Sequence, residues 1–159
     1  MNLKITTALA AAIILGACQT PPCDEEITQG QEVGMEGTAI PGTVEDFKQN
    51  VPNQVFFDFN KSNLTNDAQT DLAKQAEWLG KYSQVGVIIE GHADKRGTRE
   101  YNLALGERRA VAAKKFLEHK GVAANRLKTV SYGKDVLPAG QGDDEVTHQK
   151  NRTAITKPE

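Results

Sequence analysis

The sequence is poor in the residues on which several classes of protein depend. It contains two cysteines in 159 residues, and 6% of its residues are aromatic. Two cysteines cannot build the disulfide framework of a small secreted domain. The patterns G-x-S-x-G, H-E-x-x-H and C-x-x-C are absent, and His92, His119 and His148 do not have the spacing of metal ligands. We therefore expect a protein that is not an enzyme and that has no cofactor and no metal site.

Charge of one sign is not concentrated anywhere along the chain. The 19 basic and 21 acidic residues give a formal net charge of −2, and the basic residues do not alternate with aromatic ones as they do in proteins that bind single-stranded nucleic acid. We expect no nucleic-acid partner. A chain of this length can form one domain with a real core but is too short for two ordinary domains.

The longest apolar run lies at the N-terminus and is too short to span a bilayer. In MNLKITTALAAAIILGAC a single Lys4 precedes the apolar residues 7–15, as in a secretory signal peptide. We predict a signal peptide over residues 1–17. The four residues from Leu15 to Cys18 resemble the lipobox of bacterial lipoproteins. The alternative is a general signal peptide in which the cysteine is incidental.

The resemblance to the lipobox implies diacylglycerol on the Cys18 thiol and an acyl chain such as palmitate on its new α-amine. Several acyl chains anchor a protein firmly, because each buried methylene contributes about 0.8 kcal/mol. Gln19 at the next position, rather than Asp, favours the outer membrane by the sorting rule of lipoproteins. If Cys18 is lipidated, Cys23 has no intramolecular partner. We interpret Cys23 as a linker thiol, with an intermolecular disulfide as the alternative.

Residues 18–50 separate this anchor from the rest of the chain. The segment is rich in Pro, Gly, Gln, Thr and Glu and has no sustained helical or strand periodicity. It cannot bury enough apolar surface to offset the loss of chain entropy. We therefore predict a lipidated flexible tether over residues 18–50 and a folded head over residues 51–159. The sequence leaves open whether the short stretch VEDF, residues 44–47, packs on the head.

The order of patterns in the head predicts a single α/β domain. Thr65 is the expected N-cap of a first long helix, and Gly121 follows the end of a second. Strands are expected at 55–60, 85–91, 127–133 and 152–156, long helices at 66–82 and 99–119, and a short helix or turn at 143–151.

One charged residue of the second helix lies where solvent does not explain it. The apolar side of this helix recurs at steps of three and four residues and consists of Leu105, Gly106, Ala110, Ala113, Phe116 and Leu117. Arg109 falls inside this stripe, whereas Arg108 lies about 100° away among charged residues. An unpaired buried charge costs several kcal/mol. Arg109 is therefore expected to be paired or to line a pocket.

Asp94 is the predicted partner of Arg109. It follows an apolar strand, at the carboxyl end of which α/β folds commonly bind ligands, and the helix from Arg99 directs its free N–H groups to the same place. Two interpretations stay open. Asp94 and Arg109 can hold the ammonium and the carboxylate of a zwitterion, or they can form a salt bridge that only joins strand to helix.

Other polar residues near Asp94 have simpler explanations. We interpret His92 as a strand-end histidine bonded to nearby backbone, because no second acid or nucleophile for catalysis is recognisable beside it. Lys95, Arg96 and Arg99 make the loop basic, which favours an anionic partner. Charges on a solvated loop are the simpler interpretation of each.

The stretch GHADKRGTREYNLALGERR, from Gly91 to Arg109, is similar almost residue for residue to the signature of the OmpA-like family of peptidoglycan-binding domains, and in particular to its lipid-anchored members. The similarity continues through VFFDFNKSNLT, SYGKD and QKNR and covers roughly residues 55–155. It implies a mixed sheet with the helices packed on it. Thr153 is a departure, because the family often has an arginine at this position.

The family resemblance also implies which residues bind. In that family the aspartate of G-H-x-D and the second arginine of the helix hold diaminopimelate, a residue of the peptidoglycan stem peptide. These positions correspond to Asp94 and Arg109. Further binding positions implied by the resemblance are Asn102, Asp58, Asn60 and Arg152.

As a whole, the resemblance implies an outer-membrane lipoprotein with a monomeric head in the periplasm that binds peptidoglycan noncovalently and ties the membrane to the cell wall. It further implies the Tol system, which acts in envelope constriction during cell division, with TolB and possibly TolA as partners. The alternative is a structural envelope lipoprotein whose head binds other proteins and not the wall.

Overall fold

The computed structural model describes residues 39–159. The predicted signal peptide, the lipidation of Cys18 and most of the tether lie outside these residues. Within them, no helix is both long and apolar enough to cross a membrane.

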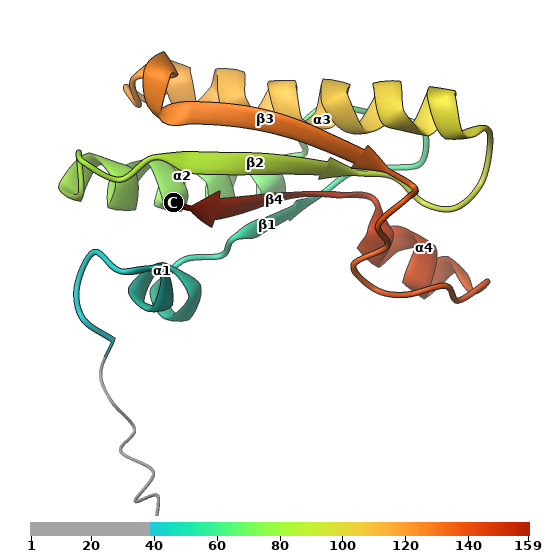
Figure 1. Ribbon diagram of the computed structural model, residues 1–159, viewed down its shortest axis with the longest axis horizontal. Coiled ribbons are helices and arrows are strands. Elements are labelled where there is room, and N and C mark those ends of the chain that lie inside the picture. Colours follow the sequence, from blue (N-terminus) through green and yellow to red (C-terminus); the bar gives the residue numbers. More distant parts are fainter. Residues whose placement is uncertain (1–38) are drawn as a thin grey trace, which may run out of the picture. The chain divides into compact units, whose positions relative to one another are not determined.

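The centre of the described part is a four-stranded mixed sheet in the order β1-β4-β2-β3. Strands β2 (Val87–His92) and β3 (Leu127–Gly133) are parallel, and β4 (Thr153–Pro158) is antiparallel to β2 and to β1 (Gln54–Phe56) (Figure 1). Strand β1 therefore runs in the same direction as β2 and β3. The carboxyl ends of these three strands meet at one end of the sheet, where α/β folds commonly place ligands.

Two long helices connect the parallel strands. Helix α2 (Asn66–Lys81) follows β1, and helix α3 (Arg99–His119) follows β2. Each begins at a threonine N-cap: the hydroxyl of Thr65 accepts a hydrogen bond from the backbone of Ala68, and that of Thr98 accepts one from Tyr101. The helices contact each other and the sheet. They start at the end of the sheet where β1 and β2 finish.

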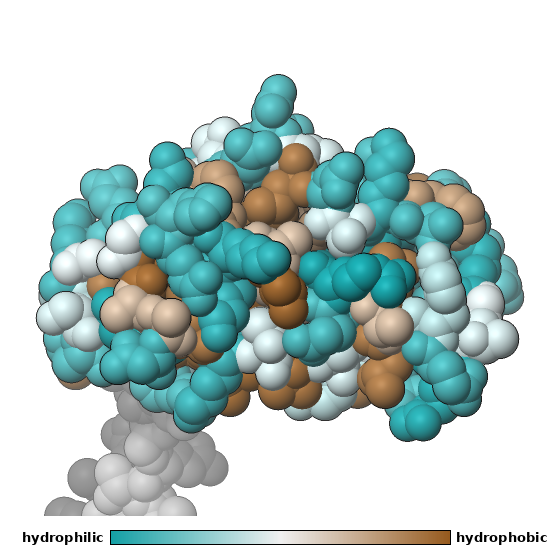
Figure 2. All heavy atoms as spheres, turned by 90° about the horizontal axis from the view of Figure 1, so that it is seen from above, coloured by the Kyte–Doolittle hydropathy of each residue, from teal (hydrophilic) through white to brown (hydrophobic). Residues whose placement is uncertain are grey.

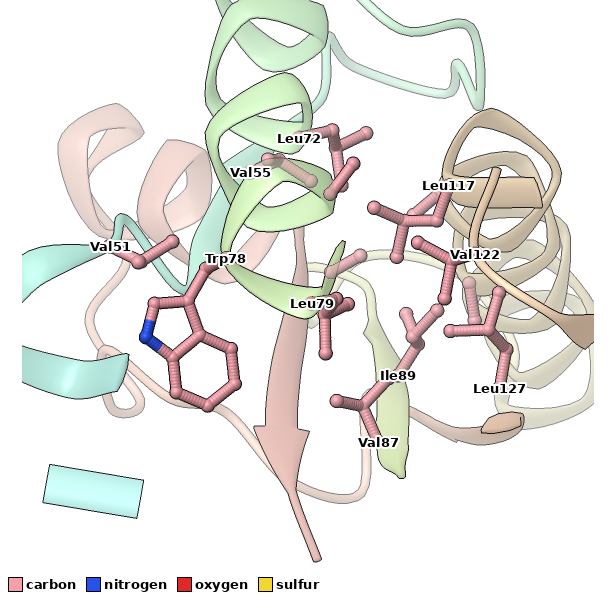
Figure 3. Close-up of a cluster of buried hydrophobic side chains, with 14 of the residues drawn as sticks. Val51, Val55, Leu72, Trp78, Leu79, Val87, Ile89, Leu117, Val122 and Leu127 are labelled. Carbon is pink, nitrogen blue, oxygen red and sulfur yellow. The ribbon is translucent and has the colours of Figure 1, made fainter. Parts of the chain in front are cut away.

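The hydrophobic core lies between these helices and the sheet (Figure 3). Leu72 and Leu79 of α2, Leu117 of α3, and Val87 and Ile89 of β2 are fully buried there. Full burial of such a side chain contributes roughly 1.5–3 kcal/mol. The helical and strand periodicities of the sequence therefore converge on one core. Seen from above the view of Figure 1, the outer surface is largely hydrophilic, with hydrophobic residues in small separate groups (Figure 2).

A contact between two glycines brings α3 against β2. A Cβ atom on Gly91 would lie 1.9 Å from the carbonyl oxygen of Gly106, and one on Gly106 would lie 2.8 Å from the carbonyl oxygen of Gly91. Only glycine fits at this crossing. Because Arg109 is one turn beyond Gly106, the contact holds its side chain close to the end of β2.

Helix α1 (Val44–Asn50) shows that the folded head begins before the boundary predicted at residue 51. Phe47 is fully buried in the core, and its ring meets that of Trp78 edge-on at 4.9 Å between centroids. The carboxylate of Asp46 accepts a hydrogen bond of 2.8 Å from the indole N–H of Trp78. The residues VEDF therefore pack on the head, and α1 is part of the compact unit rather than of a tether.

The other elements follow the predicted order with shifted ends. Helix α3 and strand β3 have the predicted bounds, and α2 ends one residue early. A 3₁₀ helix (Ala124–Arg126) precedes β3, and the predicted short helix is α4 (Glu145–Asn151). Strand β1 is shorter than predicted, since from Asp58 onward the chain leaves the sheet. In β4 the hydroxyl of Thr153 donates a hydrogen bond of 2.7 Å to the carbonyl of Val55, so this residue fits a buried position without an arginine.

Candidate functional site

A pocket lies where β1 and β2 end and α3 begins. Its volume is about 410 Å³. It is lined by Phe59, Asn60, Asp94, Arg96, Gly97, Thr98, Tyr101, Asn102, Leu105 and Arg109. Four of the six predicted peptidoglycan-binding residues, Asn60, Asp94, Asn102 and Arg109, are thus brought together on its wall.

Arg109 is buried at the base of this pocket, with an exposed fraction of 0%. Its Nε donates to the carbonyl of Lys61 at 2.9 Å, its Nη1 to that of His92 at 2.8 Å and its Nη2 to that of Asp58 at 3.2 Å. Three of the five guanidinium N–H groups are thus used, which leaves two without an acceptor among the described residues. Burial lowers the pKa of Arg109 to about 10, so the group keeps its charge at neutral pH.

Asp94 is buried beside the pocket and is bound by two other arginines. Its Oδ1 accepts a hydrogen bond from the backbone of Arg96, and its Oδ2 lies 2.6 Å from Nη2 of Arg96 and 3.4 Å from Nη1 of Arg152. Burial raises the pKa of Asp94, but the hydrogen bonds and charge of Arg96, with a further bond from Arg152, lower it below its usual value. Asp94 is therefore ionised at neutral pH.

The described residues contain no ion pair between Asp94 and Arg109, so the direct salt bridge considered as an alternative is not present. The charge of Arg109 is instead stabilised by three carbonyl dipoles and by the field of Asp94. The position of Arg109 in the apolar stripe is confirmed, and Arg108 is exposed as predicted.

Asn102 and Asn60 shape the pocket through their hydrogen bonds. The side chain of Asn102 is buried and donates to the carbonyl of Arg96 at 2.7 Å, which fixes the loop between β2 and α3. The hydroxyl of Tyr101 donates to Oδ1 of Asn60. Asn60 has a φ of 58°, a left-handed conformation that asparagine tolerates better than most residues. Asn60 therefore turns the chain after β1 so that its side chain meets α3.

The side chains of Asp58 and Arg152 do not line the pocket. That of Asp58 is exposed and pairs with Lys61 at 3.0 Å, so Asp58 contributes only its carbonyl, which binds Arg109. The guanidinium of Arg152 is buried behind Asp94, where it also pairs with Glu145 at 2.8 Å and donates to the carbonyl of Phe57 at 3.2 Å. Arg152 therefore supports the site without facing it.

Several pocket residues were not predicted as binding residues. Phe59 and Tyr101 are exposed aromatic side chains on its wall, and their occurrence inside polar segments was a usable signal. Arg96 was interpreted as a solvated loop charge, but it binds Asp94. Its neighbours on the rim are also paired, Lys95 with Asp143 and Arg99 with Asp135. The rim is thus less positive than the sequence suggests, because each of these three cations is paired with a carboxylate. The sequence did not indicate these pairs, because two of the carboxylates lie far along the chain and the third lies in a loop without periodicity.

The OmpA family matches residues 56–152, a range that includes every residue of the pocket. The chain belongs to the OmpA family. The mixed sheet with helices packed on one another and on the strands is the fold that this membership led us to expect, and that part of the prediction is confirmed.

Relatives from this OmpA family carry the name "Peptidoglycan-associated lipoprotein". One from Mesorhizobium japonicum is 46% identical over 154 residues, covering 96% of this chain and 89% of the relative. One from Brucella melitensis is 50% identical over 120 residues, covering 76% and 71%. The crystal structure of the peptidoglycan-associated lipoprotein from Burkholderia pseudomallei is 35% identical, with a TM-score of 0.65 over 68% of this chain and 91% of that one. The C-terminal domain of Helicobacter pylori MotB, at 22% identity and a TM-score of 0.61, shows the shared fold alone.

This OmpA-family domain is not an enzyme. His92, the one histidine near the pocket, is buried, and its Nδ1 bonds the carbonyl of Val136 at 3.1 Å, which confirms its interpretation as a strand-end residue bonded to backbone. Burial lowers the pKa of His92, so the ring is neutral at neutral pH. Residues 39–159 contain no group of three or more His, Cys, Asp or Glu side chains placed to hold a metal ion.

Proposed function

We propose that this protein is an outer-membrane lipoprotein whose periplasmic head binds peptidoglycan noncovalently and so ties the membrane to the cell wall. The observation that carries the proposal is that one pocket of an OmpA-family domain has a buried carboxylate, Asp94, and a buried guanidinium, Arg109, on its wall. The names of its relatives support the choice of peptidoglycan.

The ligand proposed for the pocket is the diaminopimelate of the stem peptide. When it is not crosslinked, its distal carbon carries an ammonium and a carboxylate. Asp94 is the acceptor for the ammonium, and the two remaining N–H groups of Arg109 are the donors for the carboxylate. Both contacts form in a site shielded from water, where charge-assisted hydrogen bonds are stronger than at an exposed surface. Lysine at the same place in the stem peptide lacks the distal carboxylate and loses the contact to Arg109.

The anchor and the partners are the less direct parts of the proposal. We assign residues 1–17 to a signal peptide, lipid to Cys18, and the residues between Cys18 and the head to a tether. The relatives named as lipoproteins support this assignment, and the intact mass of the membrane-extracted protein tests it. The Tol proteins TolB and TolA are proposed as partners on the strength of the family resemblance, with a role in envelope constriction during division.

Two adjacent arginines provide the test of the pocket. Arg109→Lys keeps a charge but loses the fork that grips a carboxylate, and we expect wall binding to weaken by about 2–5 kcal/mol, as when a desolvated charge pair is broken. Arg108→Lys, on the exposed side of α3, should change binding little. Sedimentation of each variant with purified peptidoglycan measures the difference.

Arg109→Lys also loses hydrogen bonds to backbone carbonyls, so its folded fraction must be measured alongside binding. A second comparison does not depend on any variant. The wild-type protein should bind walls that contain diaminopimelate more tightly than walls that contain lysine at that position. Equal binding to both walls would contradict the proposed ligand, whatever the variants do.

A further inference from the structure

In the free protein both charges of the proposed pair are already engaged by groups of the protein itself. Arg109 has no exposed surface, and both oxygens of Asp94 already accept hydrogen bonds. A carboxylate can accept about four hydrogen bonds and Asp94 accepts three, so a ligand can approach it, but the ligand's ammonium competes with the guanidinium of Arg96 for the shortest of these contacts.

Arg96 is the group on Asp94 that is free to move. Its side chain is 40% exposed and lines the pocket. Its guanidinium carbon lies 4.4 Å from the centre of the Phe59 ring, an aromatic face that is itself largely exposed. Its Nη1 already lies 3.3 Å from a second carboxylate, that of Glu145 in α4.

Arg152, the other arginine on Asp94, cannot leave in the same way. Its side chain is 4% exposed and is held by the carbonyl of Phe57 and by Glu145 in addition to Asp94. Withdrawing it would leave a buried charge without partners, which is strongly unfavourable. Arg152 also contacts Asp94 at the longer distance of 3.4 Å, against 2.6 Å for Arg96. The two arginines thus have different roles: Arg152 is a fixed counter-ion and Arg96 is an exchangeable one.

We propose that Arg96 occupies, on Asp94, the place that the ammonium of the ligand takes, and that binding is an exchange in which the guanidinium of Arg96 moves onto Glu145. The inference rests on the proposed function, because it concerns the same pocket. The exchange keeps a cation on Asp94 throughout and keeps a carboxylate beside Arg96, so no charge is left unpaired at any stage.

This exchange makes Arg96 a specificity-determining residue. A neutral ligand cannot replace a guanidinium on a buried carboxylate, because Asp94 would lose a charged partner and gain none in return. A ligand with an ammonium at the correct place can. Arg96 thus discriminates against ligands that carry a carboxylate but no ammonium.

The test is the affinity of the full-length protein, in detergent micelles, for a soluble muropeptide that contains diaminopimelate. Arg96→Gln removes the competing charge with little loss of length. We expect it to bind the muropeptide about threefold to fivefold more tightly, the range that corresponds to an ion pair of partial exposure. Arg96→Lys, which keeps the charge, should stay closer to the wild type.

Arg99→Gln is the matched control. It removes the same charge from the same loop region, but Arg99 pairs with the exposed Asp135 and does not touch Asp94. Its affinity should change by less than the range expected for Arg96→Gln. Weaker binding by Arg96→Gln would mean that Arg96 holds the ligand itself, and equal binding would mean that it does not compete; either result overturns the inference.

The outcomes separate the inference from the proposed function. If the wild-type protein does not bind the muropeptide, the proposed function fails and the exchange fails with it. If the wild type binds and Arg109→Lys binds more weakly, but Arg96→Gln does not gain affinity, then only the exchange is wrong. A carbon NMR titration of Asp94 supports the variants, because its pKa should rise in Arg96→Gln when the stronger of its partners is removed.

Discussion

The contact between Gly106 and Gly91 predicts that one added methyl group disturbs both the fold and the pocket. In Gly106→Ala the new Cβ would lie 2.4 Å from Oγ of Ser131 and 2.8 Å from the carbonyl oxygen of Gly91. The hydroxyl of Ser131 can rotate away if it gives up its hydrogen bond of 2.6 Å to the carbonyl of Leu103. The backbone of Gly91 cannot, so α3 must move outward by on the order of half an ångström in a close-packed interior.

The expected change in the unfolding free energy of Gly106→Ala follows from two opposing effects. Forcing a methyl group into a packed interface costs about 1–3 kcal/mol, and replacing glycine by alanine inside a helix returns up to about 1 kcal/mol. Gly80 in α2 measures the second effect alone, because a Cβ there meets no atom within 4 Å. We expect Gly80→Ala to be neutral or stabilising by up to about 1 kcal/mol and Gly106→Ala to unfold about 1–3 kcal/mol more easily than Gly80→Ala.

Urea unfolding of both variants gives the difference, and sedimentation with peptidoglycan gives its effect on the site. Because Arg109 lies one turn after Gly106, an outward shift of α3 lengthens its hydrogen bonds to the carbonyls of His92, Lys61 and Asp58, and wall binding should fall in Gly106→Ala but not in Gly80→Ala. If the two variants were equally stable and bound equally well, the close contact would not be what positions Arg109.

Two further predictions concern the N-terminal helix and pH. Phe47→Ala should cost about 3–5 kcal/mol of unfolding free energy, because it empties a fully buried site against Trp78. Lys48→Ala, at an exposed position of α1, should cost little. Equal effects of the two variants in a denaturant titration would place α1 outside the core. Since the pKa of Asp94 is lowered from 3.8 in the folded protein, its contribution to stability is fully present well above pH 3.8 and is lost progressively as the pH falls through 3.8 toward the folded-state pKa. The difference in unfolding free energy between the wild type and Asp94→Asn should therefore be constant from neutral pH down to about pH 5 and change only below it, and a change between pH 7 and about pH 5 would contradict the lowered pKa.

The parts of the fold that the sequence predicts are those governed by local periodicity. The bounds of α3 and β3 follow from the spacing of their apolar residues, and the N-cap at Thr65 follows from its own chemistry. Arg109 was identifiable because it breaks the pattern of its own helix. Helix α1 could not be assigned to the head in this way, because a single aromatic residue, Phe47, in a segment without periodicity does not indicate burial. The ring that Phe47 packs against belongs to Trp78, which is distant in sequence.

The partners of Asp94 could not be predicted either, because local periodicity does not connect them to Asp94. Arg152 lies 58 residues further along the chain, so no spacing rule connects the two. Arg96 is two residues away in a loop, where no periodicity predicts the direction of a side chain. The side chain of Asp58 was assigned to the site because its position matches the family motif, but the strand ends before it and turns the carboxylate toward Lys61.

Helix α1 lies at the end of the sheet opposite to the one where β2 ends and α3 begins (Figure 1), and the pocket is lined by residues of the latter end, so this arrangement has a mechanical consequence. The chain passes from α1 into β1 and reaches the pocket at Asn60, so a load between the N-terminal side of the head and a ligand in the pocket runs along β1. Strand β1 is held by its antiparallel ladder with β4, whose hydrogen bonds lie across the direction of pull. Such bonds are loaded together in shear rather than one after another. A force applied at the N-terminal side of α1 acts first on the contacts that hold this helix, namely the buried ring of Phe47 and the hydrogen bond from Trp78 to Asp46, and only then on the ladder.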